Sequence, residues 1–323
     1  MVVGQPNYEP HYEKFYIKNK NLTNALVDLI ENGVDENTDY FILPETVFQI
    51  NENKPESNST ARALKTILAK YPDLKLVSGV SAYHPFAENE PRTPAVRQQK
   101  DKNDKVLMEY ESLNAAVQYQ KDQTPQTYRK SVFVPGAELL PYRNIFFFLK
   151  PLVESLDGSI AGLGTQPHRS TFTSNKGTVA PVICYESVFG DYFTKYIRPS
   201  KYLNKSADFV AIMTNDGWWD NTAGHKQHLK FASLRAIETR RDIARSANTG
   251  VSAFINQRGD ITATTAYDER TTLKSQVHLN QKITFYVQWG DLIGRLAVFL
   301  TAILLLNTVA RNWQARANAT KKQ

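Results

Sequence analysis

The stretch Thr178-Val-Ala-Pro-Val-Ile-Cys184-Tyr-Glu-Ser-Val-Phe-Gly190 contains the only cysteine in a chain of 323 residues. Residues 179–183 form an apolar, β-branched run, a pattern that predicts a buried strand. Polar residues follow at once, and Ser187 is suited to cap a helix over residues 188–197. Cys184 is therefore expected on a sharp turn from strand to helix, at the edge of a sheet.

Two interpretations of this cysteine are open. A thiol beside a helix N-terminus has a lowered pKa, and the thiolate is the nucleophilic form, so Cys184 is a candidate for covalent catalysis. The alternative is a small core residue, which is what a lone cysteine after an apolar run usually is. The stretch alone does not separate them.

The composition is that of a globular α/β protein, with 41% hydrophobic and 22% charged residues. The length allows one large domain or two smaller ones. A single cysteine excludes an intrachain disulfide and a zinc site built on several thiolates. Residues 1–13 lack the basic start and apolar centre of a signal peptide.

The net charge of +7 raises the possibility of nucleic-acid binding, but the basic residues are scattered through the chain. They gather only at the C-terminus, where no acidic residue accompanies Arg311, Arg316, Lys321 and Lys322. A basic tail just after an apolar helix is typical of a membrane surface, so no nucleic-acid partner is expected.

An apolar helix is predicted over residues 289–310, with an uncharged centre at 296–306. It is long enough to span hydrocarbon, and Trp289 and Trp313 flank it as interfacial aromatics do. A core helix is the alternative, but the basic tail favours a transmembrane helix. By the positive-inside rule residues 311–323 are cytoplasmic, and residues 1–288 lie on the other side, the periplasm in a double-membraned bacterium.

Strands and helices alternate along the chain, which favours a layered α/β architecture with two sheets. An excursion loop is expected over 84–105, and Ser59 or Thr60 as a helix cap. Helices are predicted over 14–31, 58–70, 188–197, 225–245 and 289–310. Strands are predicted over 2–5, 39–43, 74–82, 110–120, 179–183, 207–213, 251–255, 275–279 and 283–287.

Charged residues stand beside several of these strands. Glu45 directly follows the strand over 39–43, at the edge where ligands bind in α/β folds. Lys130 opens an apolar strand, where a buried ammonium needs a partner. Glu138 follows a Pro-Gly turn. Each has an ordinary alternative: a loop acid, a snorkelling surface lysine or a loop charge.

Glu45, Lys130 and Cys184 complement one another chemically. Glu45 could take the thiol proton as general base, and Cys184 would then attack a carbonyl carbon and form a thioester. Lys130 and the backbone N–H of Tyr185 could hold the oxyanion. This chemistry needs no metal and no organic cofactor.

The surrounding motifs occur in a recognisable order. They are Leu43-Pro44-Glu45-Thr46, Tyr128-Arg129-Lys130, Val134-Pro135-Gly136-Ala137-Glu138, Ile183-Cys184-Tyr185-Glu186, Asn215-Asp216-Gly217-Trp218-Trp219, Gln227-His228-Leu229, Arg235-Ala236-Ile237-Glu238 and Arg245-Ser246-Ala247-Asn248-Thr249-Gly250. In this combination the chain resembles the nitrilase superfamily of carbon-nitrogen hydrolases, and most closely its branch of apolipoprotein N-acyltransferases. The resemblance implies a four-layer α-β-β-α sandwich over residues 1–288 with a Glu-Lys-Cys triad.

The resemblance also implies a reaction. Enzymes of this branch move a fatty acyl chain from a phospholipid, typically phosphatidylethanolamine, to the α-amino group of an apolipoprotein's diacylglyceryl-cysteine. The acyl chain would pass through a thioester on Cys184, and Glu138, Tyr185 and Glu186 match residues that support activity. The implied location is the bacterial inner membrane, with the catalytic domain on the periplasmic side.

The chain departs from this branch at its start, because full-length members carry several membrane helices ahead of the catalytic domain. A fragment, a split gene with a partner chain and a mis-started reading frame are the alternatives. A membrane-anchored nitrilase-type amidohydrolase is a second functional hypothesis, and a catalytically silent membrane-anchored binding protein is a third. Phe146–Phe148 are interpreted either as core or as an apolar flap over the acyl chain.

Overall fold

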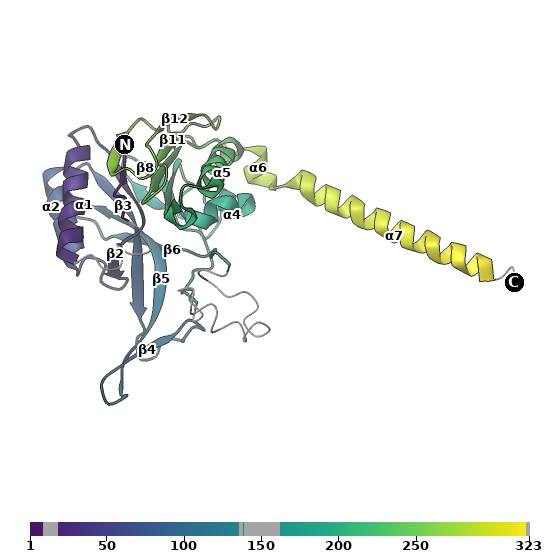
Figure 1. The fold of residues 1–323 in the computed structure, drawn as a ribbon, viewed down its shortest axis with the longest axis horizontal. Helices are drawn as coiled ribbons and strands as arrows, with labels where there is room; N and C mark the ends of the chain where they lie inside the picture. Colours follow the sequence, from purple (N-terminus) through teal and green to yellow (C-terminus); the bar gives the residue numbers. More distant parts are fainter. Residues whose placement is uncertain (9–18, 136–137, 139–161, 321–323) are drawn as a thin grey trace.

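Two β-sheets packed face to face form the centre of the protein, with helices on both outer faces (Figure 1). The computed structural model describes residues 1–8, 19–135, 138 and 162–320, with side chains undescribed at residues 19 and 316–320. The order of layers is helix, sheet, sheet, helix, as the sequence predicted.

The first sheet has the strand order β13-β1-β2-β3-β5-β4, and β6 pairs with β5. Strands β1, β2 and β3 are parallel, whereas β5 runs antiparallel to β3. The predicted loop over 84–105 is wrong in part, because it contains β4. The strands are β1 (Val2–Gln5), β2 (Tyr40–Asn51), β3 (Lys75–Pro85), β4 (Arg97–Lys100), β5 (Val106–Gln120), β6 (Gln126–Arg129) and β13 (Thr271–Lys274).

The second sheet has the strand order β12-β11-β10-β9-β8-β7. Strands β8, β9 and β10 are parallel, so their carboxyl ends lie at one edge of the sheet. Cys184 follows β8 at this edge. The strands are β7 (Phe172–Ser174), β8 (Gly177–Ile183), β9 (Phe209–Thr214), β10 (Ile243–Ala247), β11 (Ala253–Ile255) and β12 (Ile261–Thr264).

Helices α1 (Asn19–Gly33) and α2 (Ser59–Lys70) cover the first sheet, and α4 (Gly190–Thr194) and α5 (Ala223–Thr239) cover the second (Figure 1). Buried aliphatic side chains of α1 and α2 form one apolar core with β2, β3 and β5. A second core fills the space between the sheets and reaches α5. The cap of α2 is Asn58, not Ser59 or Thr60, because the Asn58 side chain accepts from the Ala61 N–H at 2.7 Å.

Two predicted helices are shorter than expected. The helix over 188–197 is replaced by a 3₁₀ helix, η2 (Cys184–Val188), and the short α4. The helix over 225–245 ends at Thr239, because Arg240 adopts a left-handed conformation with φ 51°. Residues 243–247 then form β10, a fully buried central strand whose Arg245 and Ser246 interrupt the apolar run that marks such a strand in a sequence.

The strands predicted over 275–279 and 283–287 are also wrong. The strands of this region, β12 and β13, both end before residue 275. Residues 285–289 form the helix α6 (Phe285–Trp289), which begins at a Thr284 cap. Thr284 accepts from the Val287 N–H at 3.0 Å, and this cap overrides the strand pattern. Gly290, at φ 66°, separates α6 from the final helix, so Trp289 lies before that helix.

The final helix, α7 (Leu292–Thr320), projects away from the sandwich (Figure 1). Residues Leu292–Ala315 are long and apolar enough to cross a membrane, and this stretch of helix is not buried against the rest of the protein. At about 1.5 Å per residue it measures roughly 36 Å, against about 30 Å of bilayer hydrocarbon. An apolar helix that is not buried by the described residues fits the predicted transmembrane helix better than the core-helix alternative.

Candidate active site

Cys184 lies at the carboxyl end of β8, buried between the sheets with 5% of its surface exposed. Its backbone has φ 46°, a left-handed conformation that a residue with a Cβ adopts at a cost of about 1–3 kcal/mol. The chain therefore turns sharply at the sulfur-bearing residue, as predicted. Ser187 does not cap a helix, because it lies inside η2.

Hydrogen bonds hold this turn in place. The Ser187 hydroxyl donates to the Cys184 carbonyl oxygen at 2.7 Å, and Glu186 Oε2 accepts from the Ile183 N–H at 3.0 Å. His228 Nε2, from α5, lies 3.2 Å from the same carbonyl oxygen. These contacts fix the backbone on both sides of the thiol, which offsets the strained φ.

Glu45 lies inside β2, at an irregularity in the first sheet, and not after the end of the strand, which corrects the prediction. The pairing of β2 with β3 is regular up to Leu43 and resumes at Phe48, so residues 44–47 bulge out of register. Gly79, on β3, makes room for the bulge: a Cβ there would lie 2.5 Å from the Pro44 oxygen and 2.6 Å from the Glu45 Cα. The bulge directs the buried Glu45 carboxylate inward.

Lys130 joins two carboxylates at this point. It comes directly after β6 rather than opening a strand, which corrects the prediction, and its ammonium is buried. Nζ donates to Glu45 Oε1 at 2.9 Å and to Glu138 Oε1 at 2.8 Å. The structure thus brings together three of the predicted residues, which lie far apart in the chain.

Asn114, on β5, completes this cluster and was not identified from the sequence. Its Nδ2 donates to Glu45 Oε1 at 2.7 Å and to Glu138 Oε1 at 3.1 Å, so the amide bridges the two carboxylates. β5 also buries Glu111 and Gln118, so a polar residue in this strand was not by itself a signal for the site.

The charges of the cluster act on the thiol. Burial raises the pKa of Cys184 and the charge of Glu45 raises it further, whereas Lys130 and a side-chain hydrogen bond with Thr214 act in the other direction. The expectation of a lowered thiol pKa is therefore wrong. The five-residue η2 is too short for its dipole to offset desolvation. A thiol, not a thiolate, is the resting form.

For Lys130, burial and the neighbouring charges act on the pKa in opposite directions. Burial alone would lower its pKa, but the charges of Glu45, Cys184 and Glu138 outweigh burial and hold the pKa above its usual range. Lys130 is therefore a permanent ammonium. The site holds one fixed positive charge, two carboxylates and a neutral thiol, so it can take up a proton at Glu45 and stabilise negative charge at Lys130.

Glu186 and Tyr185 have different surroundings. Glu186 is fully buried, and its Oε1 accepts from the Tyr128 hydroxyl at 2.7 Å and from the Ser131 N–H at 2.8 Å. The Tyr192 hydroxyl donates to the same oxygen. Tyr185 is half-buried, and its ring packs edge-on against the Phe189 ring, with centroids 5.1 Å apart. Glu186 is built into the turn, while the Tyr185 side chain stays outside the charged cluster.

A second polar network lies behind Cys184 and was not assigned a role from the sequence. His228 Nδ1 lies 3.1 Å from Asp216 Oδ1, and Arg245 Nη2 donates to Asp216 Oδ1 and Oδ2 at 2.9 and 2.8 Å. The Thr214 hydroxyl also donates to Asp216 Oδ1 at 3.1 Å. All four side chains are buried. The network connects β9, β10 and α5 to the carbonyl of the cysteine.

Two further expectations concern other parts of the chain. Phe146–Phe148 lie outside the described residues. Within the described residues, no group of three or more His, Cys, Asp and Glu side chains is arranged to hold a metal ion.

A buried cysteine at a strand end, next to a Lys-Glu pair between two sheets, is an arrangement that suits covalent chemistry at the thiol of an α/β sandwich. The sequence profile of the carbon-nitrogen hydrolase family matches residues 5–284. The chain belongs to this family, and the predicted resemblance to the nitrilase superfamily is confirmed.

Among curated proteins, the similar relatives are apolipoprotein N-acyltransferases. The one from Chlorobaculum tepidum is 30% identical over 313 residues, which are 95% of this chain and 56% of that protein. The one from Pasteurella multocida is 30% identical over 186 residues, 57% of this chain and 33% of that protein. The chain thus spans about half the length of the first relative.

Solved structures share the fold. Nit3 from Saccharomyces cerevisiae, a member of branch 10 of the nitrilase superfamily, has a TM-score of 0.56 at 16% identity, covering 84% of this chain and 88% of that one. XC1258 from Xanthomonas campestris, a superfamily protein with an arsenic adduct in its active site, has a TM-score of 0.54 at 14% identity over the same shares. The likeness shows the four-layer sandwich.

Proposed function

We propose that this chain is the catalytic portion of an apolipoprotein N-acyltransferase. The observation that carries the proposal is the buried Lys130 ammonium, which joins Glu45 and Glu138 where their charges act on the thiol of Cys184. The identity to the Chlorobaculum tepidum enzyme over 95% of this chain supports the choice of reaction. Glu45, Lys130 and Cys184 are the proposed catalytic residues.

In the first half-reaction a phospholipid donates its acyl chain. Glu45 takes the proton of the Cys184 thiol as the sulfur attacks the ester carbonyl carbon. The carbonyl oxygen becomes an oxyanion, which Lys130 and the Tyr185 N–H stabilise. The carbon–oxygen bond to the glycerol then breaks, Glu45 returns the proton to the glycerol oxygen, and a lysophospholipid leaves an acyl thioester on Cys184.

In the second half-reaction an apolipoprotein accepts the acyl chain. The free α-amino group of its diacylglyceryl-cysteine attacks the thioester carbon, and Glu45 accepts a proton from the nitrogen. The carbon–sulfur bond breaks, an amide forms, and the sulfur recovers its proton. The raised pKa of Cys184 favours this last step, since a neutral thiol is the stable product.

The supporting residues act by position. Glu138 shares Lys130 with Glu45, so the ammonium is held in place by two carboxylates. Glu186 accepts hydrogen bonds from both sides of the site, from Ser131 next to Lys130 and from Ile183 next to Cys184. It thereby fixes the lysine relative to the sulfur.

Both substrates are lipids, and α7 would hold the enzyme in their membrane. In this proposal residues 1–288 are the catalytic domain, 289–310 the transmembrane segment and 311–323 a basic cytoplasmic tail. The catalytic domain lies on the periplasmic side of a bacterial inner membrane, with phosphatidylethanolamine as donor and a diacylglyceryl apolipoprotein as acceptor.

Membranes containing the full chain, incubated with acyl-labelled phosphatidylethanolamine and a diacylglyceryl lipopeptide, test this function. The expected result is label in amide linkage on the lipopeptide, absent with Cys184→Ala. Release of free fatty acid or of ammonia from small amides, without label on the lipopeptide, would instead identify a hydrolase and overturn the proposal.

A further inference from the structure

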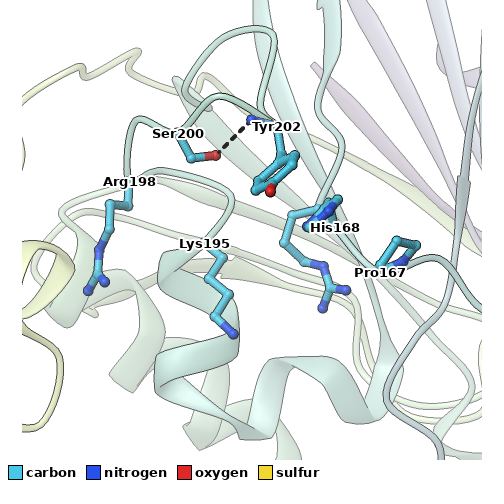
Figure 2. A pocket seen from close by; sticks show the side chains of 7 residues that line it. Pro167, His168, Lys195, Arg198, Ser200 and Tyr202 are labelled. Carbon is cyan, nitrogen blue, oxygen red and sulfur yellow. Dashed lines mark hydrogen bonds between the residues drawn. The ribbon is translucent and has the colours of Figure 1, made fainter.

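A basic pocket lies next to α4, away from the charged cluster around Cys184. Figure 2 shows Lys195 and Arg198 on one side of it and Tyr202 with His168 on the other. The pocket has a volume of about 240 Å³, and its remaining lining residues are Pro167, Arg169 and Ser200. Pockets that enclose drug-sized ligands measure roughly 300–1,000 Å³, so this one suits a small group.

Arg169 is the buried cation of this pocket, with only 8% of its surface exposed. Its guanidinium lies 3.8 Å from the centroid of the Tyr192 ring, and Nη2 makes one long hydrogen bond, 3.3 Å, to the Gln166 carbonyl oxygen. Nε is buried and has no hydrogen-bond partner within the described part of the chain. A buried donor without a partner is costly, so the hydrogen-bonding capacity of this guanidinium is not used up by the described residues.

The positive charge of the pocket is not compensated. Lys195 is exposed and Arg198 half-buried, and no carboxylate in the described ranges forms an ion pair with Arg169, Lys195 or Arg198. None of the seven lining residues is acidic. The contrast with Lys130, which has two carboxylate partners, is plain. Three cations around an acid-free cavity indicate an anion site rather than a structural ion pair.

The pocket lies beside the segment that leads to α7. Arg198 Nε donates to the Val287 carbonyl oxygen in α6 at 2.6 Å, and α7 begins at Leu292. The candidate transmembrane helix therefore starts five residues beyond a residue that touches the pocket wall. A basic group next to a membrane span attracts anionic lipid headgroups.

We propose that Arg169, Lys195 and Arg198 bind a phosphate group, carried by an anionic phospholipid at the membrane surface beside α7. A phosphate group presents several oxygens to donors that converge from different directions, and guanidinium forks match it well. The stacked rings of His168 and Tyr202, with centroids 3.6 Å apart, form a flat wall for the adjoining headgroup atoms. None of the pocket's lining residues is among the residues proposed to take part in acyl transfer at Cys184.

Calorimetry on the full chain in an uncharged detergent tests the site. Inorganic phosphate is titrated at fixed ionic strength, first alone and then with micelles preloaded with phosphatidylglycerol or phosphatidylcholine. Lys195→Gln removes one exposed cation of the pocket. Lys102→Gln, an exposed lysine in the β4–β5 hairpin away from α4 and α6, removes the same charge elsewhere (Figure 1).

We expect saturable phosphate binding that Lys195→Gln weakens about tenfold, as loss of one charge-assisted contact does, and that Lys102→Gln leaves unchanged. Phosphatidylglycerol should compete with phosphate, and phosphatidylcholine, whose headgroup carries its own cation, should compete much less. Phosphate binding without competition from phosphatidylglycerol would overturn the lipid source. Absence of saturable binding, or equal affinity in wild type and Lys195→Gln, would overturn the site. Arg198→Gln provides a second variant with the same expectation.

Discussion

Lys130 and Arg169 are both buried cations, but their surroundings differ. Lys130 has two carboxylate partners and an amide that bridges them, so its charge is fixed and compensated inside the protein. Arg169 has an aromatic face, one long hydrogen bond and a buried nitrogen without a partner among the described residues. In the two proposals, the paired cation Lys130 acts on the carbonyl of a neutral ester, whereas Arg169, which has no ion pair among the described residues, binds an anionic group.

Removal of the Lys130 charge should have the largest effect. Lys130→Met leaves the buried Glu45 and the half-buried Glu138 without their cation, and breaking a buried ion pair costs about 3–5 kcal/mol. We expect loss of acyl transfer and a clear decrease in the free energy of unfolding, measured by chemical denaturation. The double variant Lys130→Met/Glu45→Gln should recover part of that stability. No recovery would mean that the two side chains are not coupled.

Glu45→Gln should distinguish the role of Glu45 as general base from the reactivity of Cys184 as nucleophile. Loss of a general base slows a reaction by roughly 10²–10⁴-fold, so acyl transfer should fall by that factor. Alkylation of Cys184 should respond differently. Burial and the Glu45 charge both raise the pKa of the thiol. The alkylation rate of the wild type should therefore rise only at a pH above the pKa of a free cysteine.

Removal of the Glu45 charge lowers the thiol pKa again, so in Glu45→Gln the alkylation profile should shift to lower pH while acyl transfer is lost. Iodoacetamide labelling of both proteins at a series of alkaline pH values, read by peptide mass, compares their alkylation rates at each pH. An unchanged profile would show that Glu45 does not act on the sulfur.

Asn114→Ala should have a smaller effect. The amide orients both carboxylates but carries no charge, so kcat should fall about tenfold with KM little changed, as loss of one hydrogen bond to a charged group predicts. Asn103→Ala, in the exposed turn between β4 and β5, is the matched control. Equal kcat in both variants would show that Asn114 does not contribute to catalysis.

Arg169→Met should have the smallest effect on stability. It removes a cation–π contact, worth about 0.5–2 kcal/mol, but it leaves no carboxylate unpaired and relieves a buried donor. We expect a change in the free energy of unfolding of about 1 kcal/mol or less, well below that of Lys130→Met. Equal destabilisation by Arg169→Met and Lys130→Met would show that the two cations contribute equally to the free energy of unfolding.

Much of the fold and part of the site follow from local patterns in the sequence. The apolar run before Cys184 predicted β8, and the carboxylate after another such run placed Glu45 at a strand that enters the site. The resemblance to the nitrilase superfamily then joined them to Lys130. Local patterns sufficed for Cys184, which follows the end of β8, whereas Glu45 lies within β2 and reaches the site through a bulge.

Other features depend on contacts between distant parts of the chain. The bulge that turns Glu45 inward needs Gly79 on the neighbouring strand, and the thiol pKa depends on burial between two sheets. β10 begins inside the predicted helix over 225–245, because Arg245 and Ser246 break the apolar pattern that predicts a buried strand. The basic pocket is lined by residues that come before β8 and after β8 in the chain. No periodicity in the sequence shows that these residues lie together.

The most direct test of the central claim is the mass of the peptide that contains Cys184, after the full chain in membranes is incubated with phosphatidylethanolamine and no acceptor. The account predicts an added fatty acyl mass on Cys184 that hydroxylamine removes and that Glu45→Gln prevents. An unmodified Cys184 in protein that still acylates a lipopeptide would contradict it.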